Sequence, residues 1–456
     1  MSSATRDSEL GTPNGARLIV GMGATGLSVA RYLLRAGMPF AVTDSRSQPP
    51  RAPDLESLAD VPNSFGAFAS PLPLDQLAEV VVSPGVSLDE PFLHEVRAAG
   101  IPIIGDIELF ARALQPATPE ARVQSVIAIT GSNGKSTVTA LVAEMAEAAG
   151  RQVAVGGNFG RPALDLLDEG AELFVLELSS FQLALVESLA PAAATVLNVS
   201  ADHMDRHADI EDYAGIKARI FRRATVSVVN GDDARVAAMA TSGRRVVIGD
   251  RAGDWHLDGP AAAPIICRGD QAFLAAADLP LRGRHNLCNA LAALALGEAV
   301  GLPDAAMREA LQRFPGLPHR CQFVASVNGV DWVNDSKGTN VGAMLASLDG
   351  LPGPILLLAG GQAKGGDFTP VGPVMSRKGR LAILFGVDAA RIADALRDHV
   401  AIEQVPGLDE AIDRAAGVAE PGDTVLLSPG CASFDQFRGY EDRGERFMAG
   451  VRRLAA

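Results

Sequence analysis

The sequence predicts an α/β protein with three domains whose sheets are mostly parallel. Short apolar, β-branched segments alternate with helix-like segments along most of the 456 residues, which is typical of parallel sheets covered by helices. Gly-rich turns follow two of the expected strands, at residues 21–26 and 131–134. Pro- and Gly-rich connections near residues 105 and 316 predict two domain borders.

The composition limits the class of protein. Hydrophobic residues make up 48% of the chain, which is ample for large cores. The formal net charge of −14 argues against nucleic acid or an anionic membrane as a partner, because both require a basic surface. The four cysteines are scattered, without metal-site or disulfide spacing. The N-terminus is polar and no apolar run is long enough to insert into a membrane as a helix, so we expect a cytoplasmic enzyme.

The N-terminal segment predicts a βαβ unit with a nucleotide-binding turn. A strand at 17–20 leads through the Gly-rich turn at 21–26 into a helix, and the next strand ends at Asp44. Such a turn brings a diphosphate to the helix N-terminus. NAD is the obvious ligand, but the motif fits any nucleotide diphosphate, including a UDP-sugar. A later strand at 79–82 ends in a Ser-Pro-Gly turn, which is either a plain turn or part of the same ligand-binding edge.

The central domain is organised around a phosphate-binding loop at residues 130–137. An apolar strand precedes Thr-Gly-Ser-Asn-Gly-Lys-Ser-Thr, and an Ala- and Val-rich helix follows it. Backbone N–H groups at the start of that helix point at phosphates, Lys135 reaches the terminal phosphates, and Ser136 holds a magnesium ion. The loop is shorter than the usual P-loop because Ile129 stands where the pattern has glycine. The alternative is an ordinary Gly/Asn turn before a helix.

Acidic and histidine side chains follow two further strands of the central domain. Glu177 ends an apolar strand beside the expected P-loop, where a carboxylate is well placed to bind magnesium. Residues 202–207, Asp-His-Met-Asp-Arg-His, follow an expected strand at 195–200. This segment is either a functional cluster or a polar loop with solvated histidines.

A lysine stands on an apolar face of the helix expected at 210–223. Tyr213, Ile220 and Phe221 share that face with Lys217. A buried ammonium without a partner is costly, so the residues alone favour a lysine whose stem packs while its head reaches water.

Strands and helices alternate again in the C-terminal third of the chain. We expect strands at 330–334, 355–359, 381–385 and 424–428. Polar and Gly-rich loops follow three of them, at 335–340, 360–364 and 428–433, and the pattern predicts a mostly parallel sheet.

Six of these motifs together resemble the Mur ligase family, the ATP-dependent amino-acid ligases of peptidoglycan precursor synthesis. They lie at residues 130–136, 177–182, 202–205, 285–290, 319–320 and 334–337, so that the resemblance covers nearly the whole chain. It implies a Rossmann-like UDP-sugar-binding domain at 1–105, a P-loop ATPase-like ATP-binding domain at 106–316, and a Rossmann-like amino-acid-binding domain at 317–456.

The resemblance also implies an activity. The turn at 21–26 and the stretches 177–182 and 427–437 are similar to those of the members that add D-glutamate to UDP-N-acetylmuramoyl-L-alanine through an acyl phosphate, releasing ADP and phosphate. A related ligase that adds another amino acid, or L-glutamate, to a similar acceptor is the alternative within the family. An NAD-dependent oxidoreductase and a non-catalytic nucleotide-binding module are the alternatives outside it. We expect a monomer that works on these small molecules.

The family's functional residues carry over to matching positions of this chain. For ATP these are Gly131, Ser132, Asn133, Gly134, Lys135, Ser136, Thr137, Asn286 and Asn289 at the adenine, Arg320 at the phosphates and Asp335 at the ribose. For the UDP-sugar they are Ala24, Thr25, Asp44, Ser45, Arg46, Gly85, Asn158 and His203. For glutamate they are Lys337, Thr339, Lys364, Ser433 and Tyr440. The resemblance further implies two magnesium ions held by Ser136, Glu177, His203 and Lys217, and a CO₂-derived carbamate on Lys217, with Lys135, Glu177, His203 and Lys217 as catalytic residues.

Three positions depart from the family pattern near the expected glutamate site. Tyr440 stands where many relatives carry phenylalanine, and Gly338 and Gly430 stand where alanine is common. We expect D-glutamate as the incoming amino acid, with these departures bearing on the stereochemistry of its site.

Overall fold

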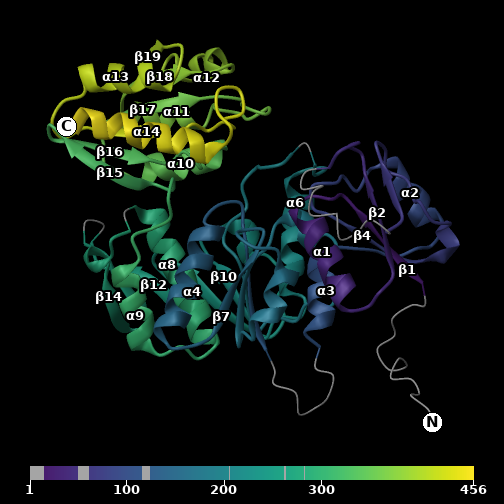
Figure 1. Cartoon of the computed structure of the whole chain (residues 1–456). Coiled ribbons are helices and arrows are strands. Elements are labelled where there is room, and N and C mark those ends of the chain that lie inside the picture. The colour runs from purple at the N-terminus through teal and green to yellow at the C-terminus, as the bar shows by residue number, and fades with distance from the viewer. Residues whose placement is uncertain are drawn as a thin grey trace, which may run out of the picture.

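The structure is a computed structural model that describes residues 15–49, 61–115, 124–204, 206–260, 263–281 and 283–455. Asp205 of the 202–205 motif therefore lies outside the described residues. The described chain forms three sheets of five, nine and six strands, each with its own helices (Figure 1). Helices in this part of the chain are all too short or too polar to cross a membrane.

The N-terminal sheet has the strand order β3-β2-β1-β4-β5 and is parallel throughout. Its strands are β1 (Ala16–Val20), β2 (Phe40–Asp44), β3 (Asn63–Phe65), β4 (Leu77–Val82) and β5 (Ile103–Ile104), with helices α1 (Ala24–Arg35) and α2 (Pro91–Ala98). The order reverses at β1, and ligands of such sheets bind at the carboxyl ends of the strands at that point. The Rossmann-like arrangement expected from the sequence is confirmed.

The central sheet has the order β14-β13-β12-β11-β10-β9-β6-β8-β7. Its strands are β6 (Ser125–Thr130), β7 (Val153–Gly157), β8 (Leu173–Glu177), β9 (Ala193–Val196), β10 (Val226–Asn230), β11 (Arg244–Gly249), β12 (Trp255–Asp258), β13 (Ile265–Arg268) and β14 (Gln271–Ala275). Helices α4 (Lys135–Ala148), α8 (Arg284–Ala299) and α9 (Asp304–Arg313) pack together on one face. Helices α3 (Asp106–Ala113), α5 (Ser180–Leu183), α6 (Ile210–Ala218) and α7 (Ala234–Ala237) lie on the other.

Two expected elements of this domain end earlier than the sequence pattern indicated. Helix α6 stops at Ala218 and continues only as a 3₁₀ turn, Arg219–Phe221, rather than as a helix to residue 223. Strand β9 ends at Val196, because the next residues turn away to contact the P-loop.

The C-terminal sheet has the order β15-β16-β20-β17-β18-β19, and only the β15–β16 pair is antiparallel among its described pairings. The strands are β15 (Gln322–Val327), β16 (Val330–Asn334), β17 (Ile355–Gly360), β18 (Gly379–Phe385), β19 (Ala401–Gln404) and β20 (Thr424–Leu427). Helices α10 (Val341–Gly350), α11 (Val371–Lys378) and α12 (Ala389–Leu396) cover one face, and α13 (Leu408–Val418) and α14 (Tyr440–Ala455) the other.

Buried ion pairs join the N-terminal sheet to the central domain. Glu79 of β4 is 2% exposed and pairs with Arg17 (2.9 Å) and with Arg112 of α3 (2.8 Å). Arg112 also pairs with Glu108, whose other oxygen accepts hydrogen bonds from the backbone N–H groups of residues 187 and 188. Side chains of α1 and α3 belong to the same apolar cluster as the central sheet. Apolar packing and ion pairs therefore hold the two domains together near residue 105.

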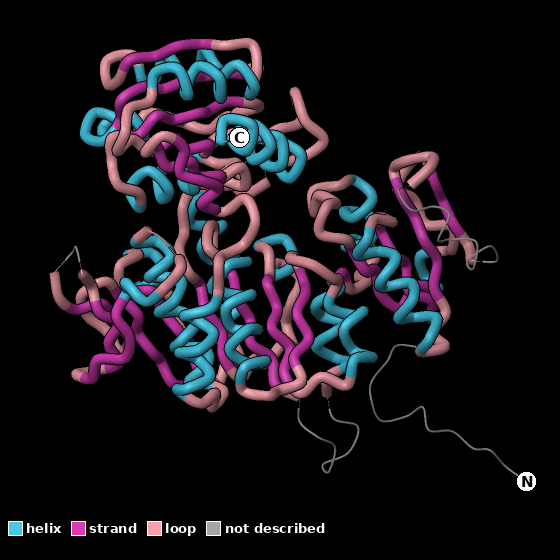
Figure 2. Tube along the Cα trace, turned by 60° about the vertical axis from the view of Figure 1, so that its left-hand side comes forward, coloured by secondary structure: helices cyan, strands magenta, loops and turns pink. Residues whose placement is uncertain are grey.

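Fewer polar contacts connect the central and C-terminal domains, which lie one above the other in Figure 2. Arg320 Nη2 donates to Ser136 Oγ at 2.9 Å, and Asn340 Nδ2 donates to Asp202 Oδ2 at 3.1 Å. Asn340 is also the N-cap of α10, because its Oδ1 accepts from the backbone N–H of Ala343. The Asn340 side chain thus caps the N-terminus of a helix in the C-terminal domain and also contacts a loop of the central domain.

The close approach of α1 to β1 predicts a steric requirement for glycine at position 26. A Cβ there would overlap the carbonyl oxygen of Gly21, whereas a Cβ at Gly23 meets no described atom within 4 Å. Gly26→Ala should therefore lower the free energy of unfolding by about 1–3 kcal/mol, the usual cost of overpacking, and Gly23→Ala should lower it less, because only the N-cap preference of α1 is lost. Thermal denaturation of both variants measures the difference, and equal stabilities would contradict this packing.

The Asn340–Asp202 contact predicts a charge-dependent domain arrangement. Asn340→Asp keeps a good N-cap but sets two carboxylates against each other, which costs about 1 kcal/mol or more at this separation. We expect a larger radius of gyration by small-angle X-ray scattering for this variant. The exchange variant Asn340→Asp/Asp202→Asn restores a donor and an acceptor and should return the wild-type value. An unchanged radius in the single variant would show that this contact does not hold the domains.

Candidate active site

The P-loop closes around a lysine. Lys135 Nζ donates to the carbonyl oxygens of Gly131 and Ser132, both at 2.8 Å. Gly134 has φ +85°, and a Cβ there would collide with Asn289, so glycine is needed on both counts. The backbone N–H of Asn133 donates to Asn198 Oδ1 at 2.8 Å. Burial lowers the pKa of Lys135 from its usual value, and Glu177 partly opposes this effect.

We predicted no role for Asn198, but its side chain fixes the conformation of the P-loop. Besides accepting from the Asn133 N–H, its amide donates to the Asn133 carbonyl at 3.1 Å. In the sequence, Asn198 was only an asparagine within the strand expected at 195–200, and no local pattern pointed to its contact with the P-loop.

A cavity of about 430 Å³ opens beside the P-loop and lies between the central and C-terminal domains. Seven of the residues assigned to ATP line it: Asn133, Gly134, Thr137, Asn286, Asn289, Arg320 and Asp335. Asp335 is buried and accepts hydrogen bonds from Ser347 Oγ (2.7 Å) and Ser428 Oγ (2.8 Å). Burial raises the pKa of this carboxyl to about 6. The remaining ATP candidates, Gly131, Ser132, Lys135 and Ser136, form the adjoining loop and helix start.

A chain of hydrogen bonds crosses the P-loop end of this cavity. Arg320 donates to Ser136 Oγ, and that hydroxyl donates to Glu177 Oε2 at 2.6 Å. Glu177 is 2% exposed at the end of β8, as the sequence predicted. Its other oxygen accepts from Asn158 Nδ2 at 2.6 Å. Asn158, assigned to the UDP-sugar, thus lies beside the P-loop carboxylate on the central domain.

Lys217 is buried rather than extended to water. Its exposure is 1%, its Nζ lies 3.0 Å from the Gly131 carbonyl oxygen and 3.3 Å from Thr130 Oγ1, and the Tyr213 ring lies 4.4 Å from Nζ. The interpretation that the ammonium reaches water is therefore wrong, because the P-loop covers the apolar face of α6. Burial lowers the pKa of Lys217 well below its usual value, and the nearby Lys135 lowers it further.

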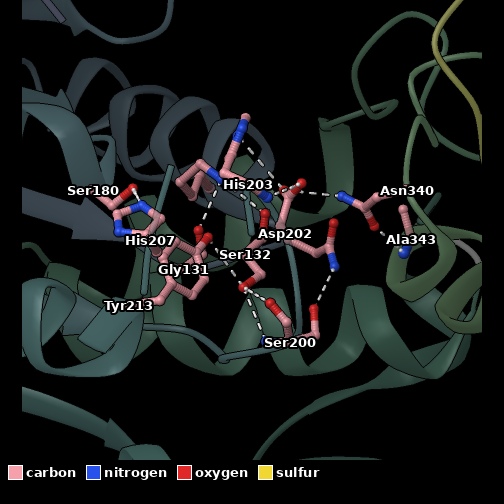
Figure 3. Close-up of polar contacts among 12 residues, drawn as sticks. Gly131, Ser132, Ser180, Ser200, Asp202, His203, His207, Tyr213, Asn340 and Ala343 are labelled. Carbon is pink, nitrogen blue, oxygen red and sulfur yellow. Dashed lines mark hydrogen bonds and ion pairs between the residues drawn. The ribbon is translucent and has the colours of Figure 1, made fainter. Parts of the chain in front are cut away.

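The two histidines of the 202–207 segment have different environments (Figure 3). His203 is half-exposed with φ +56°, and its Nε2 lies 3.8 Å from Asp202 Oδ2. His207 is buried, its Nε2 lies 3.0 Å from Ser180 Oγ, and its ring stacks on Phe181. Burial lowers the pKa of His207. The polar-loop interpretation thus fits His203 alone, while His207 belongs to a packed cluster that reaches the P-loop through Tyr213.

The N-terminal candidates meet at the carboxyl edge of their sheet, apart from Asn158 and His203, which belong to the central domain. Asp44 is 1% exposed, and its oxygens accept from the backbone N–H of Met22 (2.8 Å) and from Arg46. Burial raises the pKa of Asp44, but the hydrogen bonds from Arg46 and from the Met22 N–H, together with the charge of Arg46, outweigh burial and hold that pKa below its usual value. Asp44 therefore braces the Gly-rich turn. Of the other members, Ala24 and Thr25 begin α1, and Ser45 and Gly85 lie on the turns that follow β2 and β4.

The glutamate candidates lie on loops of the C-terminal sheet. Lys337 Nζ donates to Tyr440 Oη at 2.9 Å. Burial, followed by the charge of Arg320, lowers the pKa of Lys337 to about 8. Ser433 is buried, whereas Thr339 and Lys364 are exposed, and Lys364 has φ +47°.

The oxygen atoms near the P-loop fit a hard divalent cation. The Ser136 hydroxyl and the Glu177 carboxylate are the ligand types that Mg²⁺ prefers. Within the described residues, groups of three or more His, Cys, Asp or Glu side chains suited to a metal are absent. Lys217 as an ammonium ion does not fit a metal site, because its nitrogen has no free lone pair; an anionic derivative of that nitrogen would fit.

Three family models match consecutive parts of the chain. The Mur ligase MurD-like N-terminal domain matches residues 15–105, the Mur ligase middle domain matches 129–297, and the Mur ligase glutamate ligase domain matches 319–431. Together they span most of the sequence, and each match falls on one of the three sheets.

Relatives and solved structures agree with these matches. A UDP-N-acetylmuramoylalanine–D-glutamate ligase of Nitrosococcus oceani is 49% identical over 96% of this chain and 96% of its own length. One of Pseudomonas aeruginosa is 47% identical over 96% and 98%. A pseudomurein peptide ligase from Methanothermus fervidus shares the fold, with a TM-score of 0.61, 16% identity, and coverage of 96% and 100%. The UDP-N-acetylmuramate–alanine ligase of Thermotoga maritima does so with a TM-score of 0.59, 19% identity, and coverage of 96% and 99%. The chain therefore belongs to the Mur ligase family of ATP-dependent ligases.

Proposed function

We propose that this protein joins D-glutamate to UDP-N-acetylmuramoyl-L-alanine at the expense of ATP, in the cytoplasm and as a monomer. Relatives nearly half identical along the whole chain carry that activity in their names. The single structural observation that carries the proposal is the Arg320–Ser136–Glu177 chain of contacts, because it joins two domains at a P-loop. Phosphoryl transfer requires little more than such positioned charge.

The reaction needs an activated carboxyl group. The terminal carboxylate of the acceptor is a poor electrophile, so one of its oxygens attacks the γ-phosphorus of ATP and ADP leaves. The amine of glutamate then attacks the acyl carbon, and collapse of the tetrahedral adduct yields an amide and phosphate. Lys135 and Arg320 neutralise charge on the transferring group, in a site where burial strengthens each interaction.

The remaining ATP contacts follow from the cavity. Backbone N–H groups of residues 131–137 hold the phosphates at the start of α4. Asn286 and Asn289 face the adenine from α8, and Asp335 faces the ribose. Ser136 and Glu177 would hold one magnesium ion, and His203 and Lys217 would hold a second; the ions would supply positive charge to the phosphate oxygens.

The two other substrates bind on either side of the ATP cavity. The UDP moiety lies at the Gly-rich turn with Ala24, Thr25, Asp44, Ser45, Arg46 and Gly85, and its sugar extends toward Asn158 and His203. Glutamate lies on the C-terminal domain, where Lys337, Thr339, Lys364, Ser433 and Tyr440 supply cations and hydroxyl donors for its two carboxylates. The Tyr440 hydroxyl, which phenylalanine lacks, orients Lys337.

Lys217 carries a carbamate in the active enzyme. A low pKa leaves more of the amine neutral at pH 7–8 than in an ordinary lysine, and a neutral amine is nucleophilic. Its nitrogen adds to the carbon of CO₂, a C–N bond forms, one C=O π bond becomes the carboxylate, and the nitrogen releases a proton. The product replaces a second cation beside Lys135 with an anion, which relieves the repulsion between the two lysines.

The amino-acid specificity is tested with a panel. The wild-type protein receives the acceptor, ATP and Mg²⁺ together with D-glutamate, L-glutamate, D-aspartate, L-alanine or L-lysine. We expect phosphate release and a product of matching mass with D-glutamate only, and no release when the acceptor is omitted. Turnover with L-glutamate or another amino acid instead would assign a different member of the family, and release without acceptor would contradict the ordered acyl-phosphate route.

The carbamate is tested at Lys217 by variants and by ¹³C-bicarbonate. Lys217→Ala should be folded and lose activity by about 10²-fold or more, as for loss of a preorganised charged group. Acetate should restore part of that activity by filling the vacated space. Wild type and Lys364→Ala should both show a carbamate ¹³C signal that Lys217→Ala lacks. A fully active Lys217→Ala variant, or active wild type without the signal, would exclude the carbamate.

A further inference from the structure

Three loops at the carboxyl edge of the C-terminal sheet carry most of the glutamate candidates. The first loop, residues 335–339, follows β16; the second, 360–364, follows β17; and the third, 428–433, follows β20. We call them the glutamate loops. They contact one another through backbone hydrogen bonds, Gly430 N to Gly338 O (2.8 Å) and Gln362 N to Ala432 O (2.9 Å).

One buried arginine of α14 contacts all three glutamate loops. Arg443 is 0% exposed. Its Nε donates to Ser336 Oγ (3.0 Å), and its Nη2 donates to the carbonyl oxygens of Ser336 (2.8 Å) and Cys431 (3.2 Å). Its Nη1 makes a longer contact of 3.4 Å with the carbonyl oxygen of Gly360. Each loop thus accepts at least one hydrogen bond from the same guanidinium group.

The same helix supplies the fifth glutamate candidate. Tyr440 begins α14 one turn before Arg443, and its backbone carbonyl accepts a hydrogen bond from Ser336 Oγ at 2.8 Å. The Ser336 hydroxyl therefore stands between Tyr440 and Arg443, donating to one and accepting from the other. The position of Tyr440 Oη, and with it that of Lys337, depends on the contact between α14 and the first loop.

Stability alone does not explain why a charged side chain occupies the position of Arg443. All four acceptors of Arg443 are neutral oxygens, and a buried cation without a carboxylate among its hydrogen-bond partners keeps much of its desolvation cost. Burial accordingly lowers the pKa of Arg443 to about 10, at which the group stays charged at neutral pH. An apolar side chain of similar size would fill the space at lower cost. The charge of Arg443 is explained by the three glutamate loops that its hydrogen bonds hold in place.

We propose that Arg443 is a positioning residue for the incoming amino acid: it fixes the three glutamate loops relative to one another and to Tyr440. This rests on the proposed function, because that function assigns the loops to glutamate. A planar guanidinium fits this task, since its donors point in fixed directions at several oxygens, whereas an ammonium is a point charge on a flexible stem. Because the side chain is fully buried, it acts through Lys337, Ser433 and Tyr440 rather than on the substrate itself.

The kinetic test compares Arg443→Lys and Arg443→Ala with Arg446→Ala. Arg446 lies on the same helix but is exposed and pairs with Asp409, so it serves as the matched control. We expect the Arg443 variants to raise the KM for D-glutamate about 10- to 100-fold, as small misplacements do, while KM for ATP and for the acceptor changes by less than about threefold. Guanidinium ion at millimolar concentration should lower the raised KM of Arg443→Ala. Equal changes for all three substrates, or wild-type KM for glutamate, would overturn the proposal.

Hydrogen exchange provides a second test of the role of Arg443, and it requires no substrate. Peptides covering 335–339, 360–364 and 428–433 should exchange faster in Arg443→Lys than in wild type or Arg446→Ala, while peptides of α4 stay unchanged. Unchanged exchange in all three loops would overturn the proposal even if the Arg443→Ala variant fails to fold. A wild-type protein that makes no product with D-glutamate would refute the proposed function instead, and the loop measurement would still show whether Arg443 holds the loops together.

Discussion

Two lysines share one carbonyl oxygen at the centre of this molecule. Lys135 and Lys217 both donate to the Gly131 carbonyl, at 2.8 and 3.0 Å, and Arg320 reaches the neighbouring Ser136. Glu177 is the buried carboxylate in contact with this group. The charges of Lys135 and Arg320 repel each other when no anion is near, and their closeness becomes favourable when a triphosphate enters. Nucleotide binding therefore gains free energy by relieving a repulsion that is already present in the free protein.

The joints between domains differ in strength, and this difference fits the order in which the substrates must meet. The N-terminal domain shares an apolar cluster with the central domain, and its buried Glu79 pairs with Arg112 of α3. The C-terminal domain meets the P-loop through contacts that include Arg320–Ser136 and Asn340–Asp202, around a cavity that ATP would fill. A ligand bound between two domains adds contacts to both and thus shifts the equilibrium between open and closed arrangements. ATP is placed to do this at the second joint more than at the first.

Local sequence patterns predicted the structural features that depend on residues close together in the sequence. Most central strands of the three sheets, the two Gly-rich turns and the position of Glu177 at the end of a buried strand were predicted, because periodicity and turn chemistry encode them, whereas the edge strands β3, β15 and β19 were not. The residues around Lys217 alone favoured a head that reaches water, whereas the resemblance implied a functional lysine; its burial depends on a loop 86 residues away covering its helix. Asn158 was assigned to the UDP-sugar, but its contact with Glu177 arises from two adjacent strands of the central sheet. Local patterns did not point to the contacts that Asn198 and Asn340 make with distant residues, because those partners lie 65 and 138 residues away.

Buried cations recur at the edges of two different sheets, and the physical reason is shared. Parallel strands end with carbonyl oxygens aimed at one edge, and the loops that follow must be held without a strand ladder of their own. Lys135 and Lys217 bind such oxygens at the end of β6, and Arg443 binds them beyond β16, β17 and β20. An apolar core could fill these spaces at lower cost, but apolar contacts have no direction and allow loops to slide. Directional donors fix the loop atoms that must meet phosphates and carboxylates. The charge at each edge thus lowers stability locally and specifies the geometry on which the chemistry depends.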